Sequence, residues 1–195
     1  MKRLEALREI LPVLEESVVV TIMGAVAAEL QSFGHRANWF YLQHAMGLAS
    51  SLGLGIALCR PDLRVIVLDG DGSLLMNLGG LTTLARYRPP NLVHIVFDNE
   101  SLLSVGGFPT ATSTGSDLAA IAEGAGVPRT ARADSPADLQ NALDDAIAAG
   151  ELTTIVASVE AHYEAPSGTA GFVTDLTLLE NRFQFARHLR GLQRG

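Results

Sequence analysis

The sequence predicts a doubly wound α/β fold, in which helices cover both faces of a mostly parallel sheet. Short apolar runs rich in β-branched residues alternate along the chain with longer segments of helical periodicity. The apolar runs are nearly continuous in hydrophobicity, which is typical of strands buried on both faces of a parallel sheet. With 195 residues, of which 48% are hydrophobic, the chain has enough apolar material for one such domain.

The elements follow from these two patterns, and two helix starts carry their own signals. Ser116 or Asp117 is expected to cap one helix, and Ser135-Pro136 to open another. Residues 161–174 are rich in Gly, Pro, Ser and Thr and are interpreted as a loop, so residues 1–195 form one domain with a C-terminal arm at about 161–195. The expected strands are Val18–Ile22, Val65–Leu68, Leu92–Phe97 and Thr154–Val159; the expected helices are Met1–Glu16, Val26–Phe33, Ala45–Leu58, Leu75–Arg86, Asp117–Gly124, Pro136–Ala149 and Leu176–Leu189.

Composition excludes several classes of function. The net charge of −7, with 14 scattered basic residues, argues against a nucleic-acid surface. A single cysteine, Cys59, excludes an internal disulfide and a multi-cysteine zinc site. The longest weakly polar run, Ala45–Cys59, is shorter than the about 20 residues that a membrane span needs, and the N-terminus lacks a signal-peptide pattern. We therefore expect a soluble, cytoplasmic protein that binds neither nucleic acid nor membrane.

The chemistry is expected at the carboxyl ends of the strands, where open α/β sheets bind ligands. The strand Val65–Leu68 runs directly into Asp69-Gly70-Asp71-Gly72-Ser73, and a helix follows. Glycines let the backbone approach a ligand closely, and amide N–H groups at a helix N-terminus favour an anion. A carboxylate at the same point would repel a phosphate unless a cation lay between them, and Mg²⁺ is the natural candidate. Taken alone, Asp-Gly-Asp-Gly is equally well explained as an ordinary turn.

Asn99 favours the metal site over the turn. It follows the strand Leu92–Phe97, with 26 residues between Gly72 and Asn99. That gap fits one helix and one strand, so both loops should emerge at the same sheet edge on neighbouring strands. Asn99 is then placed to offer a side-chain oxygen to the metal that Asp71 binds.

Gly70-Asp71-Gly72 followed by Asn99 at this spacing resembles the signature of thiamine-diphosphate enzymes. The resemblance implies that the motif binds the diphosphate of thiamine diphosphate through Mg²⁺. It assigns Asp71 and Asn99 as side-chain metal ligands and Ser101 as a ligand through its backbone carbonyl. Gly72 and Ser73 would donate backbone hydrogen bonds to the phosphates, and Gly70 belongs to the same cofactor-binding set.

A third match lies upstream, at Gln43-His44-Ala45-Met46-Gly47. In the family this stretch packs beneath the bend between the two cofactor rings, and Met46, 25 residues before Asp71, falls where a large apolar residue enforces that bend. The resemblance thus implies a catalytic role for Met46 and a cofactor contact for Gly47, and His44 is a candidate for proton transfer. The simpler alternative makes Met46 an ordinary core methionine. Among the other histidines, His94 alternates within a strand and is expected to pack, and His35 lies in a loop.

The resemblance covers only one of the family's two essential domains. The glutamate that activates the aminopyrimidine belongs to a separate pyrimidine-binding domain, and the chain contains no second α/β pattern. Met46–Ser51, Asp69–Asn77 and Gly106–Thr110 resemble the sulfopyruvate and phosphonopyruvate decarboxylase family, specifically a diphosphate-binding beta subunit. The implied protein is a lyase acting on a small 2-oxo acid in a hetero-oligomer, with an alpha subunit supplying the glutamate. An acetolactate-synthase-like carboligase and a non-catalytic partner subunit remain alternatives.

Overall fold

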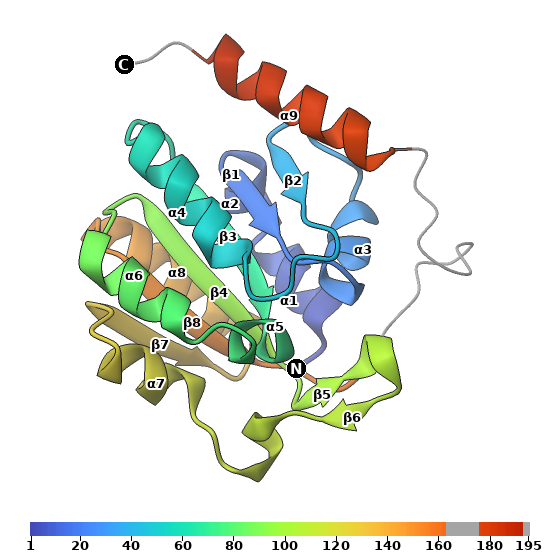
Figure 1. The fold of residues 1–195 in the computed structure, drawn as a ribbon, viewed down its shortest axis with the longest axis vertical. Helices are drawn as coiled ribbons and strands as arrows, with labels where there is room; N and C mark the ends of the chain where they lie inside the picture. Colours follow the sequence, from blue (N-terminus) through green and yellow to red (C-terminus); the bar gives the residue numbers. More distant parts are fainter. Residues whose placement is uncertain (163–175, 193–195) are drawn as a thin grey trace.

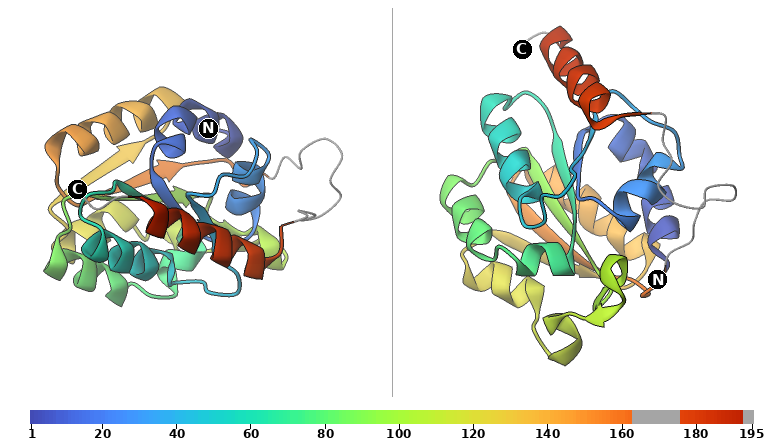
Figure 2. Two further views of the ribbon diagram at one scale, coloured as in Figure 1. Left: turned by 90° about the horizontal axis from the view of Figure 1, so that it is seen from above. Right: turned by 45° about the vertical axis from the view of Figure 1, so that its right-hand side comes forward.

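A six-stranded parallel sheet forms the centre of the fold, and the computed structural model describes residues 1–162 and 176–192. The strand order is β2-β1-β3-β4-β8-β7, and each neighbouring pair is parallel. Figures 1 and 2 show α1, α3 and α8 on one face of the sheet and α4, α6 and α7 on the other. The predicted doubly wound α/β fold is confirmed. The strands of this sheet are β1 (Val18–Thr21), β2 (Trp39–Tyr41), β3 (Val65–Gly70), β4 (Leu92–Asp98), β7 (Arg129–Ala133) and β8 (Thr153–Ser158).

Two helices begin at the capping residues that the sequence predicts. Asp117 accepts hydrogen bonds from the backbone N–H groups of Ala119 and Ala120 and so caps α7, and the Ser135 hydroxyl caps α8 just before Pro136. Both predicted caps are therefore confirmed. The helices are α1 (Arg3–Glu9), α2 (Leu11–Glu15), α3 (Ala25–Gln31), α4 (Ala49–Cys59), α5 (Asp71–Leu75), α6 (Gly79–Tyr87), α7 (Leu118–Gly124), α8 (Pro136–Ala149) and α9 (Leu178–Gly191).

Several expected boundaries were wrong. The helix expected over Ala45–Leu58 begins only at Ala49, so Met46 lies in a loop. In place of the helix expected over Leu75–Arg86 there are two helices, because α5 begins already at Asp71 and the helix is interrupted before α6. The N-terminal pattern likewise divides into α1 and α2, and the strands β2 and β7 were not predicted. The loop expected over residues 161–174 lies almost wholly outside the described residues.

A buried glycine brings α4 close to the centre of the sheet. A Cβ atom built on Gly53 would lie 2.2 Å from Cγ2 of Val67 on β3, a separation that real Cβ atoms do not show. At Gly53 the helix therefore packs directly against the chain's own sheet. Within the described residues, no helix has the length and apolarity needed to cross a membrane.

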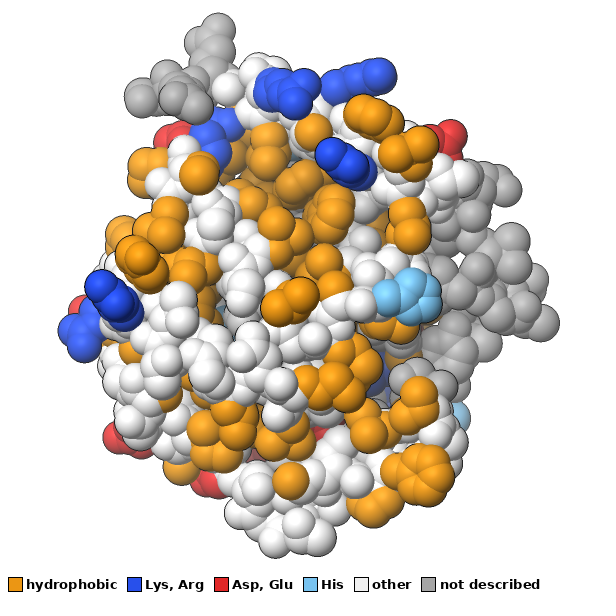
Figure 3. Space-filling model, viewed as in Figure 1, with side chains coloured by type: hydrophobic (Ala, Val, Ile, Leu, Met, Phe, Trp, Pro, Cys, Tyr) orange, Lys and Arg blue, Asp and Glu red, His pale blue; other side chains and the backbone are white. Residues whose placement is uncertain are grey.

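Hydrophobic side chains gather on the face shown in Figure 3, between α4 and α9 and around a small antiparallel hairpin. This hairpin consists of β5 (Ser101–Leu102) and β6 (Phe108–Pro109), with the 3₁₀ helix η1 (Leu103–Val105) between them and η2 (Ala111–Thr114) after it. Large hydrophobic residues exposed on or beside these elements are Leu48, Met76, Val105, Phe108, Leu179 and Phe183.

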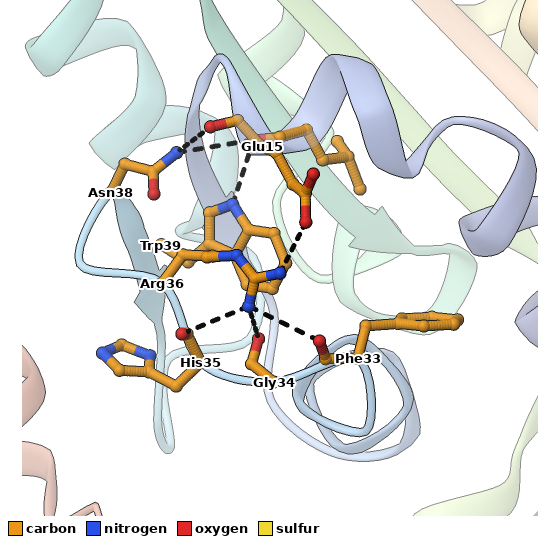
Figure 4. Close-up of polar contacts among 8 residues, drawn as sticks. Glu15, Phe33, Gly34, His35, Arg36, Asn38 and Trp39 are labelled. Atoms are coloured by element: carbon orange, nitrogen blue, oxygen red, sulfur yellow. Dashed lines mark hydrogen bonds and ion pairs between the residues drawn. The ribbon is translucent and has the colours of Figure 1, made fainter.

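The edge strand β2 is held in place by a polar network around Arg36 (Figure 4). The Arg36 guanidinium donates to the backbone carbonyls of Gly34 and His35, pairs with Glu15 at the end of α2, and lies over the Trp39 ring. The Trp39 indole N–H in turn donates to a carbonyl at the end of α2. These contacts bind the loop before β2 to the N-terminal helices, and His35 belongs to this network rather than to the sheet edge that carries the candidate site.

The helix α9 crosses the outer side of β2. The Asn181 side chain accepts a hydrogen bond from the backbone N–H of Tyr41 at 3.1 Å and donates to the carbonyl of Trp39 at 2.9 Å. His35 lies within 2.9 Å of the Gln184 side chain on the same helix. The C-terminal segment thus packs on the edge of the sheet.

Candidate functional site

The two predicted loops lie side by side at the carboxyl edge of the sheet. β3 ends at Gly70, which pairs with Phe97 of β4, and Asp71 begins α5 immediately afterwards. β4 ends at Asp98, and Asn99 follows it. The turn after β4 is tight: Glu100 has a φ of 56°, and the side chains of Asp98 and Asn99 accept the backbone N–H groups of Glu100 and Ser101. The expectation that both loops emerge from neighbouring parallel strands is confirmed.

A cavity of about 90 Å³ opens between these loops. Residues from the β1–α3 loop, from the loop before α4 and from the first turn of α5 contribute to its wall, together with the segment after β4. The lining residues are Arg3, Ile22, Met23, Gly24, Ala25, Val26, Met46, Gly70, Asp71, Gly72, Ser73, Phe97, Asn99, Ser101, Leu102 and Leu103. Seven of the nine predicted site residues are therefore in this set.

Asp71 is the one acidic residue among the described residues that line the cavity. Its side chain is buried, and burial raises the pKa of the carboxyl above its usual value, with the nearby Asp98 charge acting in the same direction. The Thr110 hydroxyl, which donates to Asp71 Oδ2 at 2.6 Å, and the backbone N–H of Gly72 lower the pKa in part. A buried carboxylate that is costly to ionise is a favourable place for a cation.

Met46 reaches the cavity because its loop is bound to α5. The backbone N–H of Gly47 donates to the Ser73 hydroxyl at 3.0 Å, and the carbonyl of Gly47 accepts from the Asn77 side chain at 2.9 Å. Gly47 has a φ of 81°, and a Cβ there would lie 2.9 Å from Cβ of Asn77, so the close approach requires glycine. Met46 lines the cavity and also packs against the core, which accommodates both interpretations of this residue.

The remaining predicted residues lie elsewhere. His44 is exposed, is absent from the cavity wall, and has a φ of 52°, with its backbone N–H donating to the sulfur of Met23. Gly47 supports the wall without lining it. His94 is fully buried in β4, as expected, with Nε2 at 3.3 Å from Asp69 Oδ2.

Three features of the site were missed from the sequence. The β1–α3 loop contributes Gly24, whose φ of 84° and ψ of −143° suit only glycine, and a Cβ there would meet nothing within 4 Å. Arg3 brings a buried guanidinium to the wall, paired with Glu29 of α3. Thr110 and Thr112 donate hydrogen bonds to the carboxylates of Asp71 and Asp98, respectively. Gly24 carried a usable signal, as a glycine close after a predicted strand at the ligand-binding edge, and Thr110 ends the family-like stretch Gly106–Thr110.

The residues present fit a diphosphate held through Mg²⁺. Asp71 and Asn99 provide oxygen atoms, which Mg²⁺ prefers, on two loops of one cavity. Within the described ranges no group of three or more His, Cys, Asp or Glu residues is arranged to hold a metal ion. A cation here would therefore take further oxygens from its ligand, as Mg²⁺ does with substrate phosphates. Because Gly24 and Gly70 have no side chains, their backbone is accessible to a ligand beside the Asp71 carboxylate.

Comparison with known proteins identifies the same class of enzyme that the sequence motif resembles. The family profile "Thiamine pyrophosphate enzyme, C-terminal TPP binding domain" matches residues 20–157. Sulfopyruvate decarboxylase subunit beta of Methanothermobacter thermautotrophicus is 44% identical over 126 residues, which is 65% of this chain and 67% of that protein. Phosphonopyruvate decarboxylase of Streptomyces viridochromogenes is 40% identical over 154 residues, or 78% of this chain and 38% of that protein.

The crystal structure of benzoylformate decarboxylase from Polynucleobacter necessarius superposes with a TM-score of 0.65 at 20% identity, covering 83% of this chain and 33% of that one. This similarity concerns the fold alone. Fold and site define an α/β domain that presents oxygen ligands at the carboxyl edge of a parallel sheet. The chain belongs to the thiamine pyrophosphate enzymes, through the cofactor-binding domain that stands C-terminal in that family.

Proposed function

We propose that the chain is the diphosphate-binding beta subunit of a thiamine-diphosphate-dependent 2-oxo acid decarboxylase of the sulfopyruvate or phosphonopyruvate type. The single observation that carries this proposal is the cavity at the ends of β3 and β4, where Asp71 and Asn99 face one space. The identity of 44% to a sulfopyruvate decarboxylase beta subunit supports the substrate class.

In this proposal Asp71, Asn99 and the backbone carbonyl of Ser101 bind Mg²⁺, which binds the cofactor's diphosphate. When bound, thiamine diphosphate supplies the nucleophilic ring carbon and the electron sink that decarboxylation of a 2-oxo acid requires. The backbone of Gly70, Gly72 and Ser73 lies against the diphosphate.

Met46 and Gly47 have a different part in this proposal. Met46 supports the bend of the cofactor from below, held there by the bonds between Gly47 and α5. His44 lies outside the cavity wall, so a part in proton transfer requires that its loop move when the partner and substrate bind.

A partner subunit completes the proposed enzyme. It contributes a pyrimidine-binding domain with the glutamate that activates the cofactor. Exposed apolar side chains beside the cavity support a protein interface there, since Leu48, Met76 and Phe108 are each at least half exposed. The naming of relatives as beta subunits supports the same arrangement.

The proposal is tested by assaying the chain with and without the partner that co-purifies with it. Thiamine diphosphate and Mg²⁺ are supplied in excess, and CO₂ release is measured from sulfopyruvate, phosphonopyruvate and pyruvate. We expect release from one of the first two substrates only when both subunits are present. Release by the chain alone would contradict the partner requirement, and a complex that binds the cofactor but releases no CO₂ from any of the three would contradict the decarboxylase assignment.

A further inference from the structure

Two buried threonine hydroxyls connect the carboxylates at the ends of the two central strands. Thr110 Oγ1 donates to Asp71 Oδ2 at 2.6 Å, and Thr112 Oγ1 donates to Asp98 Oδ1 at 2.8 Å. The two hydroxyl oxygens lie 2.9 Å apart, and both threonines are buried. Each hydroxyl gives its one hydrogen to a carboxylate, so the two threonine side chains touch without a further hydrogen bond between them. Together they form a bridge, from here on the threonine bridge, between the end of β3 and the end of β4.

Thr110 is also attached to the metal loop through its backbone. Its N–H donates to the carbonyl of Glu100 at 3.0 Å, directly after Asn99. The segment that carries it packs closely on α5, since a Cβ on Gly72 would lie 2.3 Å from Cδ2 of Leu102 and 3.5 Å from Cγ2 of Thr110. One residue thus contacts Asp71 with its hydroxyl and the neighbour of Asn99 with its main chain.

The threonine bridge reduces the electrostatic repulsion between the two carboxylates. Asp71 and Asp98 lie at the ends of neighbouring strands, where two carboxylates repel each other. A hydroxyl donor to each carboxylate offsets part of this repulsion. Threonine is stiff about χ1, so its hydroxyl loses little freedom when it is fixed. The Thr110 hydroxyl donates to Oδ2 of Asp71 and so favours one rotation of that carboxylate.

We propose that Thr110 and Thr112 are positioning residues, which orient Asp71 toward the cofactor's metal ion and hold the loops of Asp71 and Asn99 in register. The role toward the metal rests on the proposed function, whereas the bridge itself does not. Hydrogen-bonding partners of metal-binding side chains typically contribute about 10–100-fold to metal affinity.

The experiment compares Thr110→Val, Thr110→Ser and Thr112→Val with Thr114→Val in the full chain. Thr114 is the matched control, because it lies in the same turn, is exposed, and its hydroxyl donates only to the carbonyl of Ala111 within the described structure. Two quantities are measured. The first is amide hydrogen exchange of the metal-free chain over residues 71–75 and 98–101. The second is the affinity of the chain, assembled with its co-purifying partner, for Mn²⁺ in the presence of thiamine diphosphate, from the electron paramagnetic resonance signal of free Mn²⁺.

We expect Thr110→Val to accelerate exchange in both loops and to weaken Mn²⁺ binding by about 10–100-fold. Thr110→Ser keeps the hydroxyl and should remain close to wild type, Thr112→Val should act mainly on residues 98–101, and Thr114→Val should change neither quantity. Wild-type exchange and affinity in Thr110→Val, or equal effects in Thr114→Val, would overturn the proposal. Failure of the wild-type chain, assembled with the partner that co-purifies with it, to bind Mn²⁺ with thiamine diphosphate would overturn the proposed function and the metal role, while the exchange data would still decide whether the bridge exists.

Discussion

Removing one partner of the ion pair between Arg3 and Glu29 is expected to cost more stability than breaking any surface pair among the described residues. Arg3 Nε and Nη2 donate to the two carboxylate oxygens of Glu29 at 2.7 and 2.8 Å, and the two side chains are only 4% and 2% exposed. Glu29→Gln preserves the shape but leaves the guanidinium buried opposite a neutral group. Removing one partner of a buried pair costs about 3–5 kcal/mol.

The change should be large in a melting experiment. For a chain of this size 1 kcal/mol corresponds to roughly 2–4 °C, so Glu29→Gln should lower Tm by roughly 6–20 °C. Thermal unfolding followed by circular dichroism at neutral pH, with denaturant titration for the free energy, measures both quantities. Replacing both residues together, as Arg3→Met with Glu29→Leu, should cost much less than the single change, because no unpaired charge remains.

Glu15→Gln is the matched control for this prediction. Glu15 pairs with Arg36 at the surface, where the side chains are 41% and 38% exposed, and exposed pairs contribute only about 0.2–1 kcal/mol. A loss in Glu29→Gln no larger than that in Glu15→Gln would refute the reasoning, since it would show that the buried pair is effectively hydrated.

Three further predictions concern the site and the helix beside it. Because burial raises the pKa of the Asp71 carboxyl, ionisation of Asp71 destabilises the folded state as pH rises through that pKa. Metal-free Asp71→Asn should therefore have a higher Tm than wild type at pH 7. The difference in Tm should vanish near pH 3 in an EDTA-buffered series. Gly53→Ala should destabilise by about 1–3 kcal/mol in denaturant titration because its Cβ would clash with Val67, whereas exposed Gly55→Ala, which meets nothing within 4 Å, should stabilise by up to about 1 kcal/mol. Met46→Ala should reduce turnover of the assembled enzyme more than it reduces cofactor affinity. Normal turnover per folded molecule would show that Met46 is an ordinary core residue.

The central strands were predictable because burial leaves a strong pattern. Val65–Leu68 is an uninterrupted apolar run, Leu92–Phe97 is apolar except for His94, and a strand buried on both faces needs such a run. β7 lies at the edge of the sheet, where solvent accepts polar side chains, so its sequence Arg129–Ala133 lacks that pattern. β2 has only three residues, too few to show a period.

The site could be predicted only where spacing along the chain fixes geometry. Asp71 and Asn99 follow strands that are neighbours in the sheet, so their distance in sequence predicted their juxtaposition. Arg3 and Thr110 reach the same place through tertiary packing, from a helix at the start of the chain and from a hairpin with no regular pattern. Nothing in the local sequence of Arg3 distinguishes it from an ordinary surface residue. Thr110 ends the stretch Gly106–Thr110, which resembles the family, but that resemblance does not show which side chain the threonine contacts.

The contact between Asn181 and β2 has a consequence for how the sheet can grow. Its amide oxygen and nitrogen occupy main-chain positions on Tyr41 and Trp39 that a seventh strand would otherwise use. An open strand edge is a template for pairing with another chain, and proteins commonly cover it. Here one carboxamide on a helix takes the place of a strand, so intermolecular sheet extension is blocked at β2. Any strand added from another molecule would have to join at β7, on the opposite margin.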